Sequence, residues 1–338
     1  MAPDVRWGVV GTMDEPAPLI LAWVAHHLNL GAAEAHVYLD RPNPAADAAL
    51  RDLPGCFVTV CDDAYWAANA RRQRPLRHTA RQKFNATDVY RNRPLDWVLQ
   101  VDADEFLDPM GDLAAELAAL EARTVRVRNV ERVRRGGGGD IFAGSFRGVT
   151  DDAALTAAIH GRWADFLDAG MAGYHDGKDI VRTGEAFTMG VHFPLDAATG
   201  QRHGDPYVEL QSARILHFDG LTPLHVALKL LKRANEPAYK VPRKFGRQRE
   251  RQFRYVVNHV SKPVQLAKIR IDRRPGPDAG AGACRTPVRS APGLGGAGIA
   301  GGLVGRGVRC RAAHARGGVD REDRAAVVAR PQGQVRRK

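Results

Sequence analysis

Short apolar runs alternate with helical patterns over the first part of the chain. Four apolar runs end in turn or acidic residues and predict strands at residues 7–12, 35–39, 57–61 and 97–101. Apolar residues recur at helical spacing over residues 20–28, Gly31 then ends the helix, and a longer helical stretch covers residues 67–90. Strands that alternate with helices of this length predict an α/β fold, with a parallel sheet covered by helices.

Acidic residues follow three of these predicted strands. Asp14 and Glu15 come after the first strand, Asp40 after the second, and Asp102 and Asp104 after the fourth. In parallel α/β sheets the ligand lies at the carboxyl ends of the strands. Turn chemistry explains Asp40, which stands beside two prolines, and helix capping explains Asp14. Neither explains Asp102 and Asp104 well, so this pair is the strongest indication of a ligand site.

The segment W-V-L-Q-V-D-A-D-E-F-L at residues 97–107 indicates a metal site. A carboxylate drawn toward the edge of a buried strand is costly if it stays unpaired, and a divalent cation removes that cost. Mg²⁺ and Mn²⁺ prefer oxygen ligands and commonly take one or two carboxylates together with phosphate oxygens of a substrate. A D-x-D pair alone is a weak signal, but this longer context is much more specific.

With this segment the chain resembles the glycosyltransferase family 2 superfamily of the GT-A fold, and within it a bacterial branch marked by D-A-D-E-F. The resemblance spans roughly residues 6–274. Further matching blocks are Val9–Thr12 with Asp14-Glu15, the helix at residues 21–27, Tyr38–Asp40, Arg81–Asn85, Gly177–Arg182, Gly190–His192 and Leu216–Gly220. Family members usually carry Asn-Glu where this chain has Asp14-Glu15, which is a mild departure because the glutamate is kept.

The resemblance implies a fold, a domain division and an activity. The fold would be of GT-A type, with a Rossmann-like central sheet in residues 1–220, a C-terminal helical region in residues 221–274 and a basic tail in residues 275–338. The activity would be metal-dependent transfer of a sugar from a nucleotide-sugar donor to a glycan, a lipid-linked acceptor or another hydroxyl group, with inversion. Mn²⁺ or Mg²⁺ would be the cofactor.

The resemblance also implies roles for individual residues. Asp102 and Asp104 would hold the metal that bridges the diphosphate, while Glu15 and Asp40 would lie near the nucleoside. The remaining contacts to the nucleotide-sugar would come from Gln82, Lys83, Lys178 and Arg182. The three basic residues offer charge-assisted contacts to phosphate, and a solvated surface is the alternative explanation for each of them.

Two histidines and two aspartates complete the predicted site. A late histidine often completes the metal shell in GT-A folds, and both His192 and His217 follow short apolar segments. We favour His192, because Pro194 after it suggests a strand end at the surface, and a core histidine is the alternative for either. Asp176 and Asp219 are the candidates for the general base that takes a proton from the acceptor hydroxyl. A turn residue and a helix cap are their respective alternatives.

Composition adds limits on the class of protein. The 338 residues are 44% hydrophobic and 26% charged, which suffices for one large or two small domains and excludes a wholly disordered chain. The cysteines form no C-x-x-C pair and no zinc-finger spacing, which favours a reducing compartment; they are Cys56, Cys61, Cys284 and Cys310. Neither a signal peptide nor a membrane-spanning stretch is evident, so we expect a cytoplasmic protein.

The net charge of +12 lies mostly after Pro275, in a segment rich in Gly and Arg that contains no aromatic residue. Such a segment cannot build a packed core. Three explanations stay open: a basic tail that binds membrane lipid or nucleic acid, a solvated low-complexity extension, or translation of a GC-rich gene out of frame. Resequencing the gene would test the third.

Two other functions fit parts of the pattern. A nucleotidyltransferase would use a similar sheet and similar acids but would release pyrophosphate from a nucleoside triphosphate. A non-enzymatic protein that binds nucleic acid or membranes is supported only by the net charge, so no specific nucleic-acid partner is expected. The basic helical region at residues 221–262 would make a peripheral contact with an anionic membrane, or would simply pack on the protein.

Overall fold

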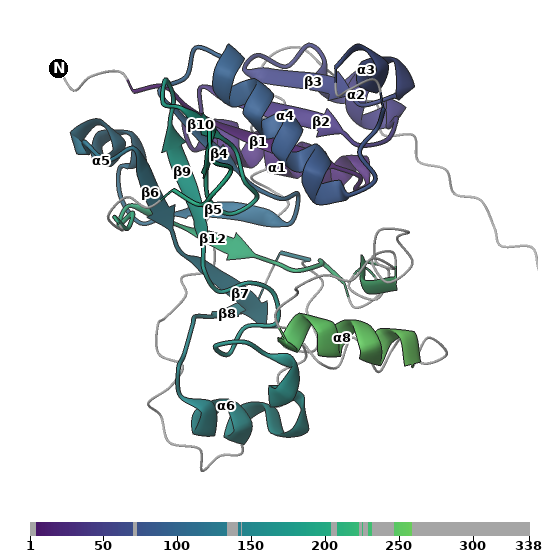
Figure 1. Cartoon of the computed structure of the whole chain (residues 1–338), viewed down its shortest axis with the longest axis vertical. Helices are drawn as coiled ribbons and strands as arrows, with labels where there is room; N and C mark the ends of the chain where they lie inside the picture. Colours follow the sequence, from purple (N-terminus) through teal and green to yellow (C-terminus); the bar gives the residue numbers. More distant parts are fainter. Residues whose placement is uncertain are drawn as a thin grey trace, which may run out of the picture. The chain divides into compact units, whose positions relative to one another are not determined.

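The computed structural model describes residues 5–69, 73–133, 141–142, 144–203, 208–222, 225, 229–231 and 247–258. The helices within these residues are α1 (Ala17–Asn29), α2 (Pro44–Leu50), α3 (Asp63–Ala68), α4 (His78–Asn92), α5 (Leu113–Ala119), α6 (Ala153–His160), the 3-10 helix η1 (Gly161–Phe166) and α8 (Arg247–Asn258). The fold is mixed α/β (Figure 1).

A six-stranded sheet has the strand order β3-β2-β1-β4-β9-β6. Its strands are β1 (Trp7–Met13), β2 (Glu34–Leu39), β3 (Cys56–Val60), β4 (Trp97–Gln100), β6 (Thr124–Val127) and β9 (Lys178–Arg182). Strands β1 to β4 are parallel and confirm the four predicted strands, whereas β9 runs antiparallel to both β4 and β6. The sheet is therefore mixed and not parallel throughout.

The strand order places a switch point between β1 and β4. The chain proceeds from β1 outward to β2 and β3 on one side, and then returns to form β4 on the other side of β1. In open α/β sheets the crevice for ligands forms at such a point, beyond the carboxyl ends of the two strands. The acidic residues that follow β1 and β4 therefore lie where a ligand site is expected.

Helices cover both faces of this sheet, as alternation of side chains along the strands requires. One cluster of buried apolar residues joins α1 to the face that carries Val9, Val37 and Leu99. A second cluster joins α4 to the opposite face, which carries Val10 and Val98. The central strands are thus buried on both sides, which fixes their carboxyl ends in place.

The predicted helix at residues 67–90 is not continuous: it takes in the last two residues of α3, a break, and most of α4. Pro75 lies between them, and a proline cannot continue a helix because it lacks the amide hydrogen and its ring clashes with the preceding turn. Asp62 caps the first of the two by accepting a hydrogen bond from the amide of Tyr65 at 2.8 Å. The break separates the surface helix α3 from α4, which carries Gln82 toward the switch point.

A second sheet has the strand order β5-β12-β7-β8. Its strands are β5 (Glu105–Pro109), β7 (Asn129–Val133), β8 (Ser145–Arg147) and β12 (Ala213–His217), and a separate two-stranded sheet pairs β10 (Phe187–Thr188) with β11 (Leu195–Asp196). In the second sheet His217 pairs with Glu105 of β5 and with Glu131 of β7. The register therefore brings three titratable residues from distant parts of the chain into one row.

The structure describes part of the predicted C-terminal helical region. Gln252 of α8 donates hydrogen bonds to the carbonyl oxygens of Phe166 at 2.6 Å and Ala172 at 2.8 Å, so α8 packs on the segment that follows α6. Contacts divide the chain into residues 1–303 and residues 304–338, and the predicted tail at 275–338 lies outside the described residues. Its three explanations stay predictions.

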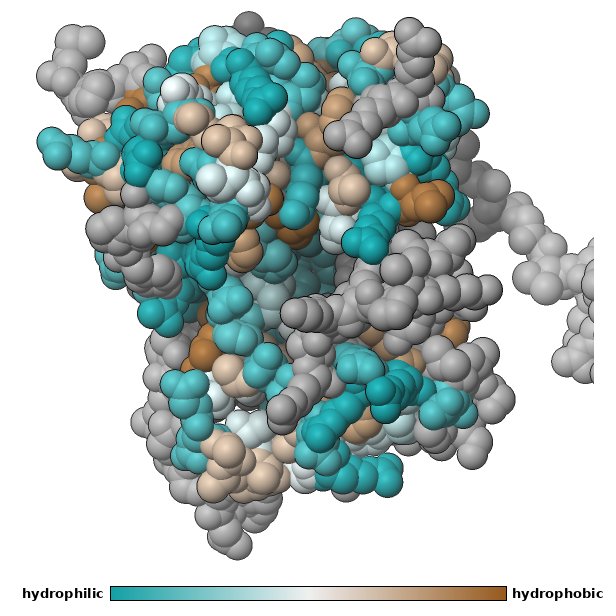
Figure 2. Space-filling view, in the orientation of Figure 1, coloured by the Kyte–Doolittle hydropathy of each residue, from teal (hydrophilic) through white to brown (hydrophobic). Residues whose placement is uncertain are grey.

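A helix that spans a membrane needs sufficient length and apolar character. Among the described residues, none of the helices combines the length and apolar character needed to cross a bilayer. In the view of Figure 2, most of the coloured surface is hydrophilic and the apolar residues form small separate patches. Scattered apolar surface of this kind is ordinary for a folded domain and needs no partner to explain it.

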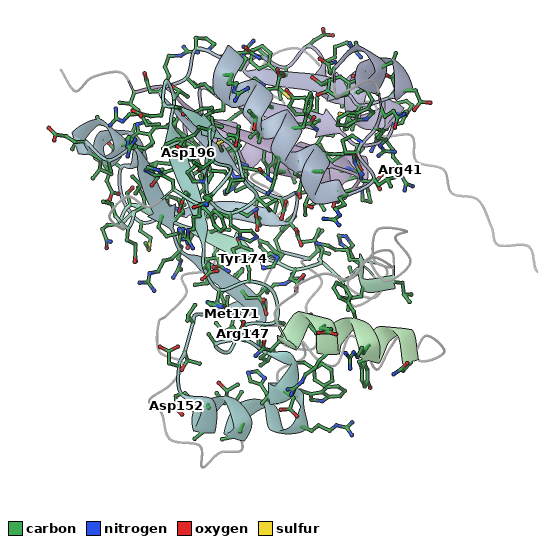
Figure 3. All side chains as sticks on the ribbon, viewed as in Figure 1. Arg41, Arg147, Asp152, Met171, Tyr174 and Asp196 are labelled. Atoms are coloured by element: carbon green, nitrogen blue, oxygen red, sulfur yellow. The ribbon has the colours of Figure 1, made fainter. Side chains whose placement is uncertain are left out.

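A tight turn at Ala169 and Gly170 contains a strained residue. Asp168 and Met171 exchange two backbone hydrogen bonds of 2.8 Å, and the two residues between them have φ values of 46° and 76°. Positive φ at both positions is typical of a type I′ turn, for which Asn-Gly is the preferred pair. Figure 3 labels Met171, at the end of this turn.

We expect Ala169→Asn to raise the free energy of unfolding by about 1 kcal/mol, because asparagine tolerates the left-handed region better than alanine. Urea unfolding measures the change. Gly170→Ala is the opposing control and should destabilise the protein, since its added Cβ would lie 2.8 Å from Cγ2 of Thr150 in addition to the positive φ. Equal stability of the Ala169→Asn variant and the natural chain would contradict the assignment of strain.

Candidate functional site

A tight turn joins β4 to β5 and carries the D-x-D pair. The amide of Glu105 donates to the carbonyl oxygen of Asp102 at 3.0 Å, and the amide of Asp102 donates to Oε2 of Glu105 at 2.7 Å. These reciprocal bonds close the turn directly beyond the carboxyl end of β4. The Asp102 and Asp104 side chains are therefore presented by a fixed backbone, as a metal or phosphate site requires.

Asp104 is held from the other side by the end of β12. The amide of Phe218 donates to the carbonyl oxygen of Asp104 at 2.9 Å, and the amide of Gly220 donates to its Oδ2 at 3.0 Å. The first bond continues the antiparallel pairing of β12 with β5, and the second joins the backbone after β12 to the Asp104 side chain. The D-x-D turn and the His-Phe-Asp segment thus form one unit, although they are far apart in the sequence.

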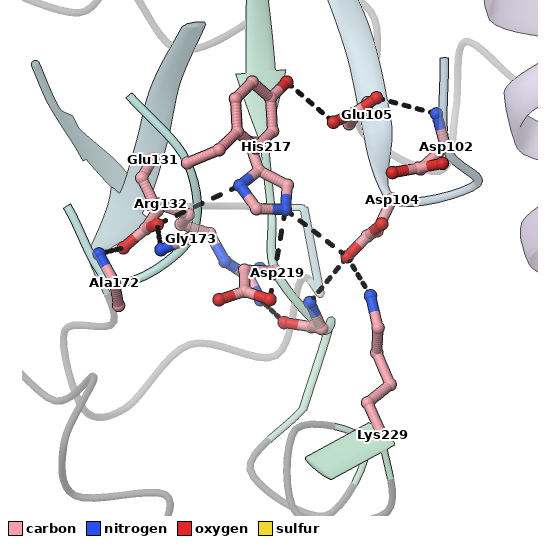
Figure 4. A network of polar contacts seen from close by, with 12 residues as sticks. Asp102, Asp104, Glu105, Glu131, Arg132, Ala172, Gly173, His217, Asp219 and Lys229 are labelled. Atoms are coloured by element: carbon pink, nitrogen blue, oxygen red, sulfur yellow. Dashed lines mark hydrogen bonds and ion pairs between the residues drawn. The ribbon is translucent and has the colours of Figure 1, made fainter. Parts of the chain in front are cut away.

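This unit gathers three side chains that can ligate a cation. One ligand atom each from Asp104, His217 and Asp219 lies within 4.8 Å of the others, and all three residues are buried. Nε2 of His217 is 3.9 Å from Oδ2 of Asp104 and 3.9 Å from Oδ1 of Asp219 (Figure 4). Two carboxylates suit Mg²⁺ or Mn²⁺, and the imidazole shifts the preference toward Mn²⁺. We call Asp104, His217 and Asp219 the cation cluster. Its set of ligand atoms fits the predicted cofactor.

The backbone at Asp219 is strained. Its φ is 46°, in the left-handed region that residues other than glycine rarely adopt. Aspartate is among the residues that tolerate this conformation best, and such outliers gather at ligand sites. The conformation places the Asp219 carboxylate beside His217 and Asp104.

Lys229 places a positive charge on this cluster. Its Nζ lies 2.5 Å from Oδ2 of Asp104. Burial alone would raise the pKa of Asp104, but the positive charge of Lys229 holds that pKa well below its usual range. Asp104 is consequently a carboxylate at neutral pH, which is the form that binds a cation.

A second buried cation, Lys178, supports the turn from the side of the larger sheet. Its Nζ lies 2.5 Å from Oε2 of Glu105 and 3.3 Å from Oδ2 of Asp102, and only 1% of its side chain is exposed. Burial would lower the pKa of Lys178, but Asp102 and Glu105 together raise it. In turn, although burial favours the neutral acid, Lys178 lowers the pKa of Asp102 to about 2.

The pKa of Glu105 is shifted in the opposite direction from that of Asp102. It is fully buried, and burial raises its pKa despite the charge of Lys178. Its Oε1 accepts a hydrogen bond from the hydroxyl of Tyr174 at 2.7 Å. Tyr174, labelled in Figure 3, packs its ring against His217 with 5.2 Å between centroids, so it links this carboxylate to the cation cluster.

Three of the residues predicted to contact the nucleotide-sugar follow strands, or point toward turns, at this edge of the larger sheet. Their side chains have different partners. Gln82 of α4 donates to Oδ1 of Asp102. Glu15 follows β1; burial raises the pKa of its carboxyl group, and the charge of Lys229 opposes this by lowering that pKa. Asp40 follows β2 but is taken up by Arg81, which donates to both its carboxylate oxygens at 2.6 and 2.7 Å.

Other predicted residues are not brought to the cluster. Lys83 is exposed on α4. Arg182 donates to the carbonyl oxygens of Leu120 and Ala122 and stacks over Trp97, which begins β4. Since the D-x-D turn follows the end of β4, Arg182 lies at the opposite end of the sheet.

His192 and Asp176 lie on neighbouring loops. Nδ1 of His192 is 3.3 Å from the carbonyl oxygen of Gly177, and burial lowers the pKa of its ring to about 4. The structure thus brings His217, and not the favoured His192, to Asp104. The Asp176 carboxylate is exposed and lies 3.5 Å from Nδ1 of His175. Asp219, the other candidate base, belongs to the cation cluster.

Four residues of the candidate site carry little signal in the sequence. These residues are Glu105, Glu131, Tyr174 and Lys229. Glu105 stood in the D-A-D-E-F motif but was assigned no role, and Lys229 lies in the region predicted as a basic helix. Glu131 follows an apolar residue in a short strand, and nothing in its neighbourhood indicates a partner more than eighty residues away.

Comparison with known proteins includes a weak likeness to a solved structure. No protein family and no curated protein matches the sequence. Among solved structures, residues 1–349 of S. aureus TarS align over 76% of this chain and 72% of the other, with 11% identity and a TM-score of 0.33. A likeness at this level carries no argument about function, which has to come from the residues themselves.

The Lys178 network gives a prediction about stability. Lys178→Met leaves the buried Glu105 without its cation, and we expect a loss of about 3–5 kcal/mol in the free energy of unfolding. Glu105→Gln in the same chain should recover most of this loss, because the buried charge is removed along with its partner. Urea unfolding of the single and double variants measures the coupling.

Lys83→Met is the matched control, since Lys83 is exposed, and it should stay within about 0.5 kcal/mol of the natural chain. If Lys178→Met alone were as stable as the double variant, the ion pair with Glu105 would not be what holds the turn.

Proposed function

We propose that the protein is a metal-dependent glycosyltransferase that transfers a sugar, with inversion, from a nucleotide-sugar to a hydroxyl group of a glycan, a lipid-linked acceptor or another molecule. The observation that carries the proposal is the cluster of Asp104, His217 and Asp219 next to the carboxyl end of β4. It lies beside the switch point of the larger sheet, where α/β folds bind nucleotides.

A diphosphate fits this cluster better than a neutral ligand. Three protein ligands leave further coordination positions for phosphate oxygens. When bound, Mn²⁺ or Mg²⁺ would stabilise the negative charge that develops on the nucleoside diphosphate as it leaves. Lys229, beside Asp104, is the described basic residue best placed to donate to the same phosphates. Glu15 and Gln82 would lie toward the nucleoside and the D-x-D turn.

The sugar-transfer step rests on the sequence blocks that resemble glycosyltransferase family 2. Deprotonation of the acceptor hydroxyl requires a base near the anomeric carbon. Asp176 is our proposed base, because its carboxylate is exposed on the loop that precedes β9, whereas Asp219 is engaged in the cation cluster. A cytoplasmic location and contact with a membrane surface remain predictions from the sequence.

The rival functions differ in their products. A nucleotidyltransferase with the same acids would release pyrophosphate from a nucleoside triphosphate, whereas the proposed enzyme releases a nucleoside diphosphate from a nucleotide-sugar. A protein that only binds nucleic acid or membranes would release neither. Product analysis with both classes of substrate therefore separates the three.

The first test is thermal unfolding of the full chain with UDP, GDP, dTDP and CMP, each with and without Mn²⁺. A ligand at ~100 times its dissociation constant adds about 2.7 kcal/mol to the stability of the state it binds. We expect one nucleotide to stabilise the protein only with Mn²⁺, and Asp104→Asn and Asp219→Asn to abolish that effect. Asparagine keeps the shape of aspartate and also tolerates the φ of 46° at residue 219.

Asp151→Asn is the matched control, because Asp151 is exposed, and it should respond like the natural chain. Stabilisation by a nucleotide without metal, or in both cluster variants, would contradict the proposed site. A flat response to every nucleotide in a folded sample would favour the binding-protein alternative.

Lys229→Gln tests the proposed phosphate contact. Removing its charge should weaken nucleoside diphosphate binding by roughly 10-fold, the loss of one charge-assisted hydrogen bond. The same change should strengthen binding of Mn²⁺ alone, because a like charge leaves the cation site. Isothermal titration of each ligand measures both effects.

Lys83→Gln provides the comparison, since Lys83 was predicted from the sequence as a phosphate contact but is exposed on α4. We expect it to change neither affinity. A larger loss of nucleotide affinity for Lys83→Gln than for Lys229→Gln would contradict this assignment.

A further inference from the structure

His217 has carboxylates on both sides of its ring. Nε2 faces Asp104 and Asp219, each at 3.9 Å, and Nδ1 faces Oε2 of Glu131, also at 3.9 Å (Figure 4). Among the described residues, Nδ1 has no hydrogen-bond partner although it is buried. The nearest carboxylate on that side therefore belongs to a residue outside the cation cluster.

Glu131 is held in place from three directions. It is 1% exposed, and it accepts hydrogen bonds from the amides of Ala172 at 3.0 Å and Gly173 at 2.6 Å. Arg147 of β8 donates to its Oε1. Donors of this kind favour the ionised carboxylate, so Glu131 presents a fixed negative charge to the ring of His217.

Gly173 lets the carboxylate and the ring approach each other. A Cβ at this position would lie 2.7 Å from Cε1 of His217, 2.9 Å from Oε2 of Glu131 and 3.0 Å from Nδ1 of His217. No ordinary side chain fits such a space. The backbone of this segment thus packs against both groups and supplies a hydrogen bond to one of them.

We propose that Glu131 is a positioning residue that keeps the proton of His217 on Nδ1 and leaves the lone pair of Nε2 toward the cation cluster. A neutral imidazole carries one N–H and one lone pair. A cation in the cluster would take the lone pair of Nε2, so the proton then has to lie on Nδ1, the nitrogen that faces Glu131. A shift of about 0.7 Å in the ring or the carboxylate would bring Nδ1 and Oε2 from 3.9 Å to hydrogen-bond distance. This inference rests on the metal site of the proposed function.

The pairing has a measurable consequence for metal binding. Partners that orient a metal-binding histidine typically change metal affinity by 10- to 100-fold when they are lost. Glu131→Gln keeps the size of the side chain but removes its charge. We expect it to weaken Mn²⁺ binding by about 10- to 100-fold, with electron paramagnetic resonance of free Mn²⁺ as the measurement.

A second readout needs neither metal nor activity. In metal-free protein labelled with ¹⁵N-histidine, two-bond correlations of the ring report which nitrogen carries the proton, and His217→Ala identifies the signal among the 12 histidines of the chain. We expect a larger fraction of Nδ1–H in the natural chain than in Glu131→Gln, because without the charge of Glu131 only the carboxylates beside Nε2 attract the proton. A role limited to structure would leave the tautomer unchanged while lowering stability.

His217→Ala also serves as the background for a double variant. In that background Glu131→Gln should have no further effect on Mn²⁺ affinity, because the group it orients is absent. Thermal unfolding of each variant without metal establishes that it is folded, and Glu131→Asp supplies a variant that keeps the charge if Glu131→Gln does not fold.

The outcomes separate this inference from the proposed function. Unchanged Mn²⁺ affinity in Glu131→Gln, or the same Nδ1–H fraction in Glu131→Gln as in the natural chain, would overturn the role of Glu131 alone. Absence of Mn²⁺ binding in the natural chain would overturn both this inference and the proposed metal site. A lower Nδ1–H fraction in Glu131→Gln, together with the expected fall in Mn²⁺ affinity, would establish the positioning role.

Discussion

The pairing of β5 with β12 is the constraint on which the candidate site depends. It places His217 opposite Glu105 and lets the backbone of Phe218 and Gly220 bind Asp104. Without this register, the D-x-D turn would end at the edge of the larger sheet with its carboxylates facing only the Lys178 side. With it, the turn also faces a histidine and a third acid, and the arrangement becomes a set of cation ligands.

The two lysines at the turn have different physical roles. Lys178 is enclosed by Asp102 and Glu105 and is almost fully buried, so its charge is already matched and it holds the turn to the larger sheet. Lys229 contacts Asp104 from outside both sheets and is partly exposed. Of the two ammonium groups, only that of Lys229 has the exposure needed to reach a phosphate. The choice between structural and binding roles therefore follows from burial, which the sequence does not display.

How much of the structure can be predicted from the sequence depends on how far apart in the chain the interacting residues are. Strands β1 to β4 and the acids after them were predictable, because apolar runs and their ends are local features. The choice of His217 over His192 was not, since it depends on the pairing of strands more than a hundred residues apart. Arg182 shows the same limit within one strand: four residues of strand span about 13 Å, so Lys178 and Arg182 lie near opposite ends of β4.

Two residues with similar backbone strain show why the site is more than a turn. Ala169 and Asp219 both have a φ of 46°. At Ala169 a two-residue turn requires the conformation, and the side chain contributes nothing to it. At Asp219 glycine would adopt the same backbone at less cost, so the strain is consistent with a use for the carboxylate, which lies beside His217 and Asp104. Gly173 is the opposite case, because a side chain there would collide with both Glu131 and His217. The strained residue Asp219 and the glycine at position 173 both lie next to the imidazole of His217, which is therefore the centre of the candidate site.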